Sequence, residues 1–131
     1  MSSAAVTAWH QVVRDRDPRQ LKALLAQDVV FHSPIVHTPQ QGRAVTMQYL
    51  GAALNVFGNE SFHYVREVIG TRDAVLEFEV EIEGILVNGI DMLSWNEVDQ
   101  ITDFKVLIRP LKAVNLIHQK MMAMLAAAQQ Q

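Results

Sequence analysis

Asp91 is the residue whose setting most strongly suggests chemistry. It stands in the segment GIDMLSW, where the alternating positions place it on the same face as apolar residues. An ionised carboxylate among hydrophobic side chains is costly unless it is hydrogen-bonded, paired or protonated. Desolvation also raises the pKa of a carboxyl group, which suits a general acid or base. We predict that Asp91 is catalytic; the alternative is a structural carboxylate paired with a histidine, an indole N–H or the backbone.

Histidines form the second group of candidates. His37 lies in the segment HTPQQG, whose composition predicts a loop, and a neutral imidazole there could donate to a substrate carbonyl or to Asp91. The alternative, an imidazole satisfied by backbone groups, applies also to His32 and His63. No pair of histidines has the spacing of a metal site such as His-x-x-x-His, and the chain has no cysteine. We therefore expect neither a metal nor a cofactor.

Aromatic and aliphatic side chains complete the candidate site. The polar tips of Trp9 and Tyr49 need partners if the rings are buried, and the Tyr49 hydroxyl could stabilise an oxyanion, although packing is the simpler role. The predicted ligand-binding residues are Trp9, Tyr49, Phe78, Leu93, Trp95, Phe104 and Val106.

The segment from 74 to 110 must position these residues as antiparallel strands. Asn88-Gly89 predicts a two-residue hairpin turn, because a type I′ turn needs positive φ at both central residues. A second turn at Val98-Asp99 sets Leu93 beside Phe104. The apolar wall that follows from these two registers is Leu76, Phe78, Val80, Ile82, Leu86, Leu93, Trp95, Phe104, Val106 and Ile108, with Asp91 in its midst.

The opposite face of the same strands is mixed. Glutamates form an acidic row on the first strand, and Lys105 and Arg109 lie on the last, so we expect Arg109 to form a salt bridge unless a one-residue bulge turns it inward. An apolar centre inside a polar rim is typical of an interface, which predicts a homodimer; the alternative is a C-terminal helix folded across the patch. The predicted patch is Ile85, Val87, Ile90, Met92 and Leu107.

Helices and short strands account for the rest of the chain. We predict helices capped by Ser2 or Ser3, over PRQLKALLAQ, over 43–57 and from Pro110 to about Ala128, with strands at 28–35 and 61–69. The register of the second strand is open by one residue. Either His63, Val65, Glu67 and Ile69 face the core, or Phe62, Tyr64, Arg66 and Val68 do.

Length and composition narrow the class of protein. A chain of 131 residues, half of them hydrophobic, predicts one domain over 1–131 with a sizeable core. The apolar runs are too short for a membrane span, and the first residues do not resemble a signal peptide, so we expect a soluble cytoplasmic protein without membrane association. A net charge of −3 without a basic run argues against nucleic acid as a partner.

The order of these elements and several short motifs resemble the nuclear-transport-factor-2-like superfamily, specifically its SnoaL-like branch. The motifs are the early Trp9, DVVFHSP followed by Gln41-Gly42, the helix that ends in FG, and above all GIDMLSWNEVDQITDFKVLIRP. The resemblance covers nearly the whole chain. One departure is the turn from Glu97 to Gln100, where family members often carry Asp-Gly.

The resemblance implies an α+β cone, in which a strongly curved antiparallel sheet of four main strands wraps round helices and encloses an apolar pocket. In related isomerases and cyclases an acid in the cone removes a proton next to a carbonyl, and His37 would lie near the pocket mouth. We therefore expect a small apolar ligand and a cofactor-independent isomerase or cyclase that uses Asp91. The alternatives are a non-catalytic dimeric binding or interaction module, and epoxide hydrolase-like or dehydratase chemistry, because this superfold carries many activities.

Overall fold

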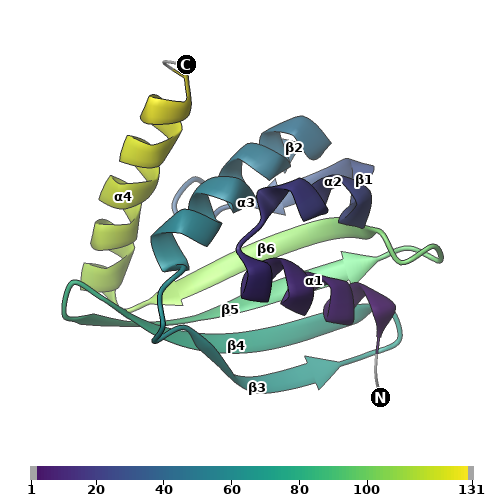
Figure 1. Ribbon diagram of the computed structural model, residues 1–131, viewed down its shortest axis with the longest axis horizontal. Coiled ribbons are helices and arrows are strands. Elements are labelled where there is room, and N and C mark those ends of the chain that lie inside the picture. The colour runs from purple at the N-terminus through teal and green to yellow at the C-terminus, as the bar shows by residue number, and fades with distance from the viewer. Residues whose placement is uncertain (1–2, 130–131) are drawn as a thin grey trace.

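Helices lie on one face of a curved six-stranded sheet in the computed structural model, which describes residues 3–129 (Figure 1). The strands are ordered β2-β1-β6-β5-β4-β3 across the sheet. In chain order the elements are α1 (Ala4–Asp15), the 3-10 turn η1 (Pro18–Gln20), α2 (Leu21–Leu24), β1 (Leu25–His32), β2 (Gln40–Gln41), α3 (Arg43–Phe57), β3 (His63–Ile69), β4 (Asp73–Ile82), β5 (Ile85–Trp95), β6 (Ile101–Arg109) and α4 (Leu111–Gln129). This is the α+β architecture predicted from the sequence.

The first helix begins at its predicted cap, but the second helical segment is shorter than predicted. Ser3 caps α1, since its Oγ accepts a hydrogen bond from the Val6 N–H at 3.4 Å. The predicted helix PRQLKALLAQ is wrong beyond its first turns, because Leu25 already has extended backbone and starts β1. As a strand, this segment buries Leu25 and Val29 in the core. Among the described residues, no helix is long and apolar enough to cross a membrane.

The sheet is mixed, because β1 runs parallel to β6 and antiparallel to β2. The sequence predicted the antiparallel strands β3 to β6 but not this parallel pair. Phe31 of β1 pairs with Phe104 of β6, and both rings are buried. The N-terminal part of the chain therefore shares its core with the last strand.

The hairpin predicted at Asn88-Gly89 is wrong. The chain turns at Glu83 and Gly84, whose φ angles are 52° and 80°, as a type I′ turn requires. Asn88 and Gly89 lie inside β5, which pairs with β4 over its whole length, from Ile82 opposite Ile85 to Asp73 opposite Ser94. The physical reason is that this longer hairpin keeps the odd-numbered residues of β5 on the core face without interruption.

The shifted turn exchanges residues between the two faces of the sheet. Leu86, predicted inside, is 57% exposed, whereas Val87, predicted in the outer patch, is completely buried. Ile85, also assigned to that patch, packs against the core. The outer apolar centre consists instead of Leu86, Ile90, Met92 and Leu107, which we call the outer patch.

The register between β5 and β6 agrees with its prediction at the site. Leu93 pairs with Phe104 and Asp91 with Val106, while a bulge after Ser94 shifts Trp95 to pair with Ile101. Arg109 faces outward as predicted, but its Nε donates to the Asn88 Oδ1 at 2.9 Å and it forms no ion pair among the described residues.

The C-terminal helix does not fold across the outer patch. Ala113 and Ile117 of α4 are buried against Phe78, Val80 and Val87, all on the inner face of the sheet. Figure 1 shows α4 on the same side of the sheet as α1 and α3, at one end of the strands. The outer patch therefore has no covering element among the described residues.

Candidate functional site

A cavity of about 240 Å³ lies between the helices and the inner face of the sheet. Asp91 is the buried carboxyl group in its wall, only 6% exposed. The mostly apolar lining comes from α1, α3, the turn after α3 and the strands β3 to β6. It consists of Trp9, Val13, Arg14, Arg16, Leu50, Ala53, Leu54, Phe57, Gly58, Asn59, Glu60, Phe62, Tyr64, Phe78, Asp91, Phe104 and Val106.

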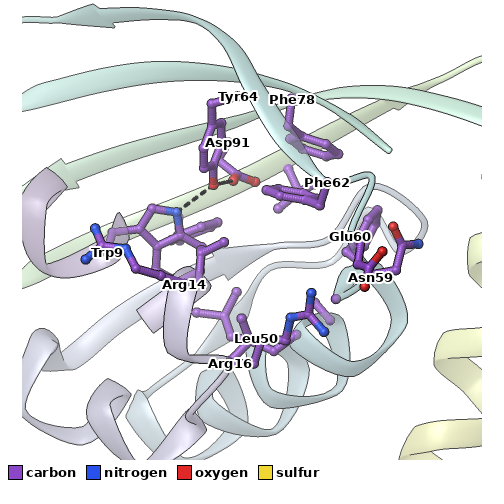
Figure 2. Close-up of a pocket in the computed structure, with 17 residues that line it drawn as sticks. Trp9, Arg14, Arg16, Leu50, Asn59, Glu60, Phe62, Tyr64, Phe78 and Asp91 are labelled. Atoms are coloured by element: carbon purple, nitrogen blue, oxygen red, sulfur yellow. Dashed lines mark hydrogen bonds between the residues drawn. The ribbon is translucent and has the colours of Figure 1, made fainter. Parts of the chain in front are cut away.

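A short chain of hydrogen bonds ends on Asp91. The Tyr64 hydroxyl donates to the Asp91 Oδ2 at 2.7 Å, and the Trp9 indole N–H donates to the Tyr64 oxygen at 2.9 Å. Figure 2 shows Tyr64 and Asp91 on the sheet side of the cavity and Trp9 on the helix side. Each donor thus orients the next group, and Asp91 accepts the last hydrogen bond.

The other oxygen of Asp91 faces the cavity. Its Oδ1 accepts no hydrogen bond from the described residues, which give the carboxyl group only the Tyr64 bond to Oδ2. No fully enclosed side-chain N or O atom in the described chain lacks a partner, so Oδ1 is not fully enclosed. One carboxylate oxygen is therefore held by protein, and the other is available to a ligand.

Burial sets the protonation of both groups. Desolvation raises the pKa of Asp91 from its ordinary value to about 7, although the hydrogen bond from Tyr64 and the nearby Trp9 indole N–H act in the opposite direction. Burial also raises the pKa of Tyr64 well above its usual value, and the nearby Asp91 charge adds to that rise. At neutral pH the phenol is a neutral donor, while Asp91 can both lose and accept a proton.

Local packing explains how these groups come together. Trp9 lies on the buried face of α1 and meets Phe104 edge-on, with ring centroids 4.7 Å apart. A bulge in β3 between Tyr64 and Arg66 turns Tyr64 inward opposite Phe78, while Arg66 pairs opposite Glu77 on the outer face. Beyond the bulge, inward and outward positions are exchanged.

The bulge also answers the question that the sequence left open. Neither predicted register of 61–69 holds throughout, because Tyr64 faces the core from one half of β3 and Glu67 lies opposite Leu76 in the other. The His10 imidazole contacts the Glu67 carboxylate, and its ring meets Tyr64 edge-on at 5.0 Å. Only one of the two predicted registers placed Tyr64 on the core face, and that register fails beyond the bulge.

Aromatic rings form the wall beside the carboxyl group. Phe62 stacks on Phe78 with centroids 5.2 Å apart, and Tyr64 meets Phe62 edge-on at the same distance. Phe57 meets Phe78 edge-on at 5.6 Å. Gly89 makes room for this cluster, since a Cβ there would come within 2.5 Å of the Phe78 ring.

The structure gathers most, but not all, of the predicted site residues. Trp9, Phe78, Phe104 and Val106 line the cavity together with Asp91. The remaining predicted ligand-binding residues do not line it: Leu93 and Trp95 are buried in the neighbouring core, and Tyr49 stacks on Phe31 beside a second cavity of about 60 Å³.

His37 is exposed in the loop between β1 and β2 and lines neither cavity. The other histidine candidates lie on the outer face, where His32 contacts Asp103 at 2.9 Å and His63 approaches Glu79 at 3.9 Å. Within residues 3–129, no three histidine, aspartate or glutamate side chains gather as a metal site would require.

The chain also matches known proteins. The family model described as SnoaL-like domain matches residues 6–104. A steroid delta-isomerase from Pseudomonas aeruginosa is 33% identical, with a TM-score of 0.91 over 98% of this chain and 93% of that one. No curated protein matches the chain.

Two further structures extend this comparison. An uncharacterised bacterial protein with a cystatin-like fold, from Silicibacter pomeroyi, is 32% identical, with a TM-score of 0.84 over 92% of this chain and 84% of that one. The epoxide hydrolase/cyclase-like enzyme SalBIII is 14% identical, with a TM-score of 0.64 over 80% of this chain and 88% of that one, and this similarity concerns the fold alone.

Proposed function

Because this chain belongs to the SnoaL-like domain family, we propose that it is a cofactor-independent isomerase or cyclase acting on a small apolar carbonyl compound. Asp91 would be the general acid–base group. The observation that carries the proposal is a buried carboxyl group in the wall of a mostly apolar cavity, and this burial raises its pKa to about 7. A pKa near the working pH lets one group both take and return a proton.

The proposed reaction moves one proton within the substrate. Ionised Asp91 takes a proton through Oδ1 from the carbon next to the carbonyl, and the electron pair of that C–H bond passes into an enolate. The neutral acid then returns the proton to another carbon of a conjugated enolate, which gives an isomer. Once Asp91 is protonated, the Tyr64 hydroxyl is free to donate to the enolate oxygen instead.

The same geometry makes hydrolytic chemistry less suitable. Opening an epoxide with water by the two-carboxylate route needs a second acid close to the first. The other carboxyl group of the cavity wall is Glu60, which is exposed at the rim. We therefore favour proton transfer by a single carboxyl group. A non-catalytic binding protein could have the same cavity but would not exchange the protons of its ligand.

The pH dependence of proton exchange tests this function. Deuterium exchange at the carbons next to the carbonyl of cyclohexanone and β-tetralone should be saturable and should follow the ionisation of Asp91. The rate constant should rise with pH and level off above about 7, because the base must be deprotonated. Tyr64→Phe removes a hydrogen bond that lowers this pKa, so its profile should shift to higher pH.

His63→Gln is the control for this shift, since His63 lies on the outer face and should leave the profile unchanged. Nuclear magnetic resonance follows the exchange directly. Binding of both ketones without saturable exchange at any pH would contradict the enzymatic proposal and favour a binding module.

We also propose that two copies pair through the outer patch. This face has an acidic row on β4, including Glu79 and Glu81, and the basic residues Lys105 and Arg109 on β6, with the outer patch between them. A two-fold axis along the strands would place β4 of one copy over β6 of the other. Charge complementarity therefore favours a homodimer with apolar residues at its centre.

Met92→Lys tests this assembly. A charge at the centre of the interface should weaken dimerisation by at least about tenfold, because the ammonium group would be buried without a partner. Val98→Lys is the matched control, since Val98 is exposed in the turn between β5 and β6. Sedimentation or light scattering measures both. A wild-type protein that is monomeric at micromolar concentration would contradict the proposal.

A further inference from the structure

The second cavity, of about 60 Å³, lies on the other side of α3 from the first. The first cavity is lined by α1 and α3, and the second by α3, α4 and the segment 33–36 that follows β1. Figure 1 shows α3 between α1 and α4, on the inner face of the sheet. Three residues nevertheless line both cavities, namely Ala53, Phe57 and Val106. The two spaces are therefore neighbours with a common wall.

The common wall begins directly beside Asp91. Val106 is the cross-strand partner of Asp91 in the pair of β5 and β6, and both residues line the first cavity. Side chains that oppose each other on neighbouring strands have Cβ atoms about 5 Å apart. A molecule that reaches the Asp91 carboxyl group therefore also lies next to the wall of the second cavity.

Phe57 is the part of this wall that is most free to move. Ala53 and Phe57 are four residues apart on α3, so they lie on the same side of the helix. Ala53 has only a methyl group, which leaves the Phe57 ring as the main obstacle between α3 and Val106. Phe57 is also the last residue of α3 and precedes Gly58, where the helix backbone is least constrained. Rotation of the Phe57 side chain away from Val106 would join the two cavities.

The second cavity offers little to a polar ligand. No carboxyl, ammonium or guanidinium group of the described chain lines it. The Ser33 hydroxyl oxygen already accepts hydrogen bonds from the Ile35 N–H at 3.0 Å and from the Val36 N–H at 3.3 Å. The other polar side chains of this wall are Tyr49 and the exposed His118. An apolar space holds water poorly, so hydrocarbon is the occupant that suits it.

The far wall of the second cavity is adaptable and reaches the surface. Met121, Met122 and Leu125 of α4 line it, and unbranched methionine side chains adjust readily to the shape of a ligand. At its outer end Val36 is 43% exposed and Met122 is 58% exposed. An apolar path, interrupted by the Phe57 ring, thus extends from Asp91 to the surface beside α4.

We propose that the substrate is a ketone with an alkyl tail, and that the tail passes between Phe57 and Val106 into the second cavity. The ketone lies at Asp91, and this end of the placement rests on the proposed function. The other route for a tail is the opening of the first cavity, whose exposed lining residues are Arg14, Arg16 and Glu60. Charged side chains and their water make that opening a poor place for hydrocarbon.

The length of the tail measures what the second cavity contributes. 4-Methylcyclohexanone and 4-pentylcyclohexanone carry the tail opposite the ketone and differ by four methylene groups. A fully buried methylene group strengthens binding about three- to fourfold. Moving the Phe57 ring and ordering the tail offset part of this gain, so we expect the pentyl compound to have a dissociation constant at least about tenfold lower. Titrations followed by nuclear magnetic resonance give both constants.

Leu125→Trp should remove most of this preference, because the larger side chain fills the second cavity from a wall that the first cavity does not share. The pentyl compound should then bind at least about fivefold more weakly than to the wild type, and the methyl compound equally well. Met124→Trp is the matched control, since Met124 lies on the same helix and lines neither cavity. Phe57→Leu should raise the ratio of the two affinities, because a smaller side chain obstructs the tail less.

Methionine methyl groups locate the tail directly. In protein with isotope-labelled methionine methyl groups, the end of the pentyl chain should show nuclear Overhauser contacts to Met121 and Met122. Met92 on the outer face is the internal control and should show none. A pentyl preference that Leu125→Trp leaves unchanged, or a tail without contact to either methionine of the second cavity, would overturn the inference.

Alcohols separate this inference from the proposed function. 4-Methylcyclohexanol and 4-pentylcyclohexanol have no carbonyl group, so their binding does not depend on proton transfer. A preference for the pentyl alcohol that is lost in Leu125→Trp would support the tail site whether or not the ketones exchange. Equal binding of the two alcohols by the wild type would overturn the inference. Exchange that survives in Asp91→Asn would overturn the proposed function while leaving the preference for the pentyl alcohol intact.

Discussion

Asp91→Asn should abolish turnover while leaving the protein folded. The replacement is nearly isosteric, and its amide oxygen can still accept the hydrogen bond from Tyr64, but it cannot take up a proton. Loss of a general acid–base group lowers the rate constant by about 10²–10⁴-fold. We expect kcat for deuterium exchange to fall by this factor with little change in KM, because the cavity keeps its shape.

Asp103→Asn is the matched control, since Asp103 contacts His32 on the outer face and does not line the cavity.

The stability of the folded protein provides a second check on Asp91. The folded-state pKa of about 7 lies above the usual value of an unfolded aspartate, so the folded protein binds more protons between the two values. This contribution to stability should therefore decrease as pH rises to about 7 and then level off, and the decrease should be absent in Asp91→Asn. Equal exchange rates in variant and wild type would exclude the acid–base role.

Gly89→Ala should be the most damaging exchange of a glycine for alanine in the sheet. Its Cβ would lie 2.5 Å from the Phe78 Cζ, 2.7 Å from the Leu107 carbonyl oxygen and 2.9 Å from the Ile108 Cγ2. Moving a backbone oxygen and a buried ring is expensive, so the free energy of unfolding should fall by about 3 kcal/mol. Chemical denaturation measures the loss as a lower midpoint with an unchanged m-value.

Gly84→Ala separates crowding from backbone conformation. Gly84 has a φ of 80°, and a Cβ at this position would meet no atom within 4 Å. Alanine there should therefore cost only about 1 kcal/mol, which is the cost of its left-handed backbone. Gly89 has no positive φ, and its cost should come from contacts alone. A larger loss in Gly84→Ala than in Gly89→Ala would contradict this explanation.

The sequence predicted the fold and the main acidic residue because both follow from alternation. The positions of Leu93 and Phe104 relative to Asp91 depend only on which residues share a face, and that pattern is clear in β5 and β6. The hairpin prediction failed because Asn88-Gly89 is the stronger local turn signal, whereas the strand is decided by packing along its whole paired length. Glycine at this position serves the close approach of Phe78 and not a turn.

Tyr64 shows what alternation alone cannot predict. A bulge changes the face of every residue beyond it, and nothing in HYVREVI marks the bulge between Tyr64 and Arg66. The hydrogen-bond chain from Trp9 through Tyr64 to Asp91 therefore required the structure.

The parallel pairing of β1 with β6 has a consequence for the order in which the protein can fold during synthesis. Val29 and Phe31 belong to β1, yet the strand that covers their edge, Ile101–Arg109, is made much later in the chain. Until β6 leaves the ribosome, β1 has only the two-residue β2 beside it in the sheet. A nascent chain that ends before Ile101 would therefore expose an apolar strand edge, the kind of surface that chaperones bind.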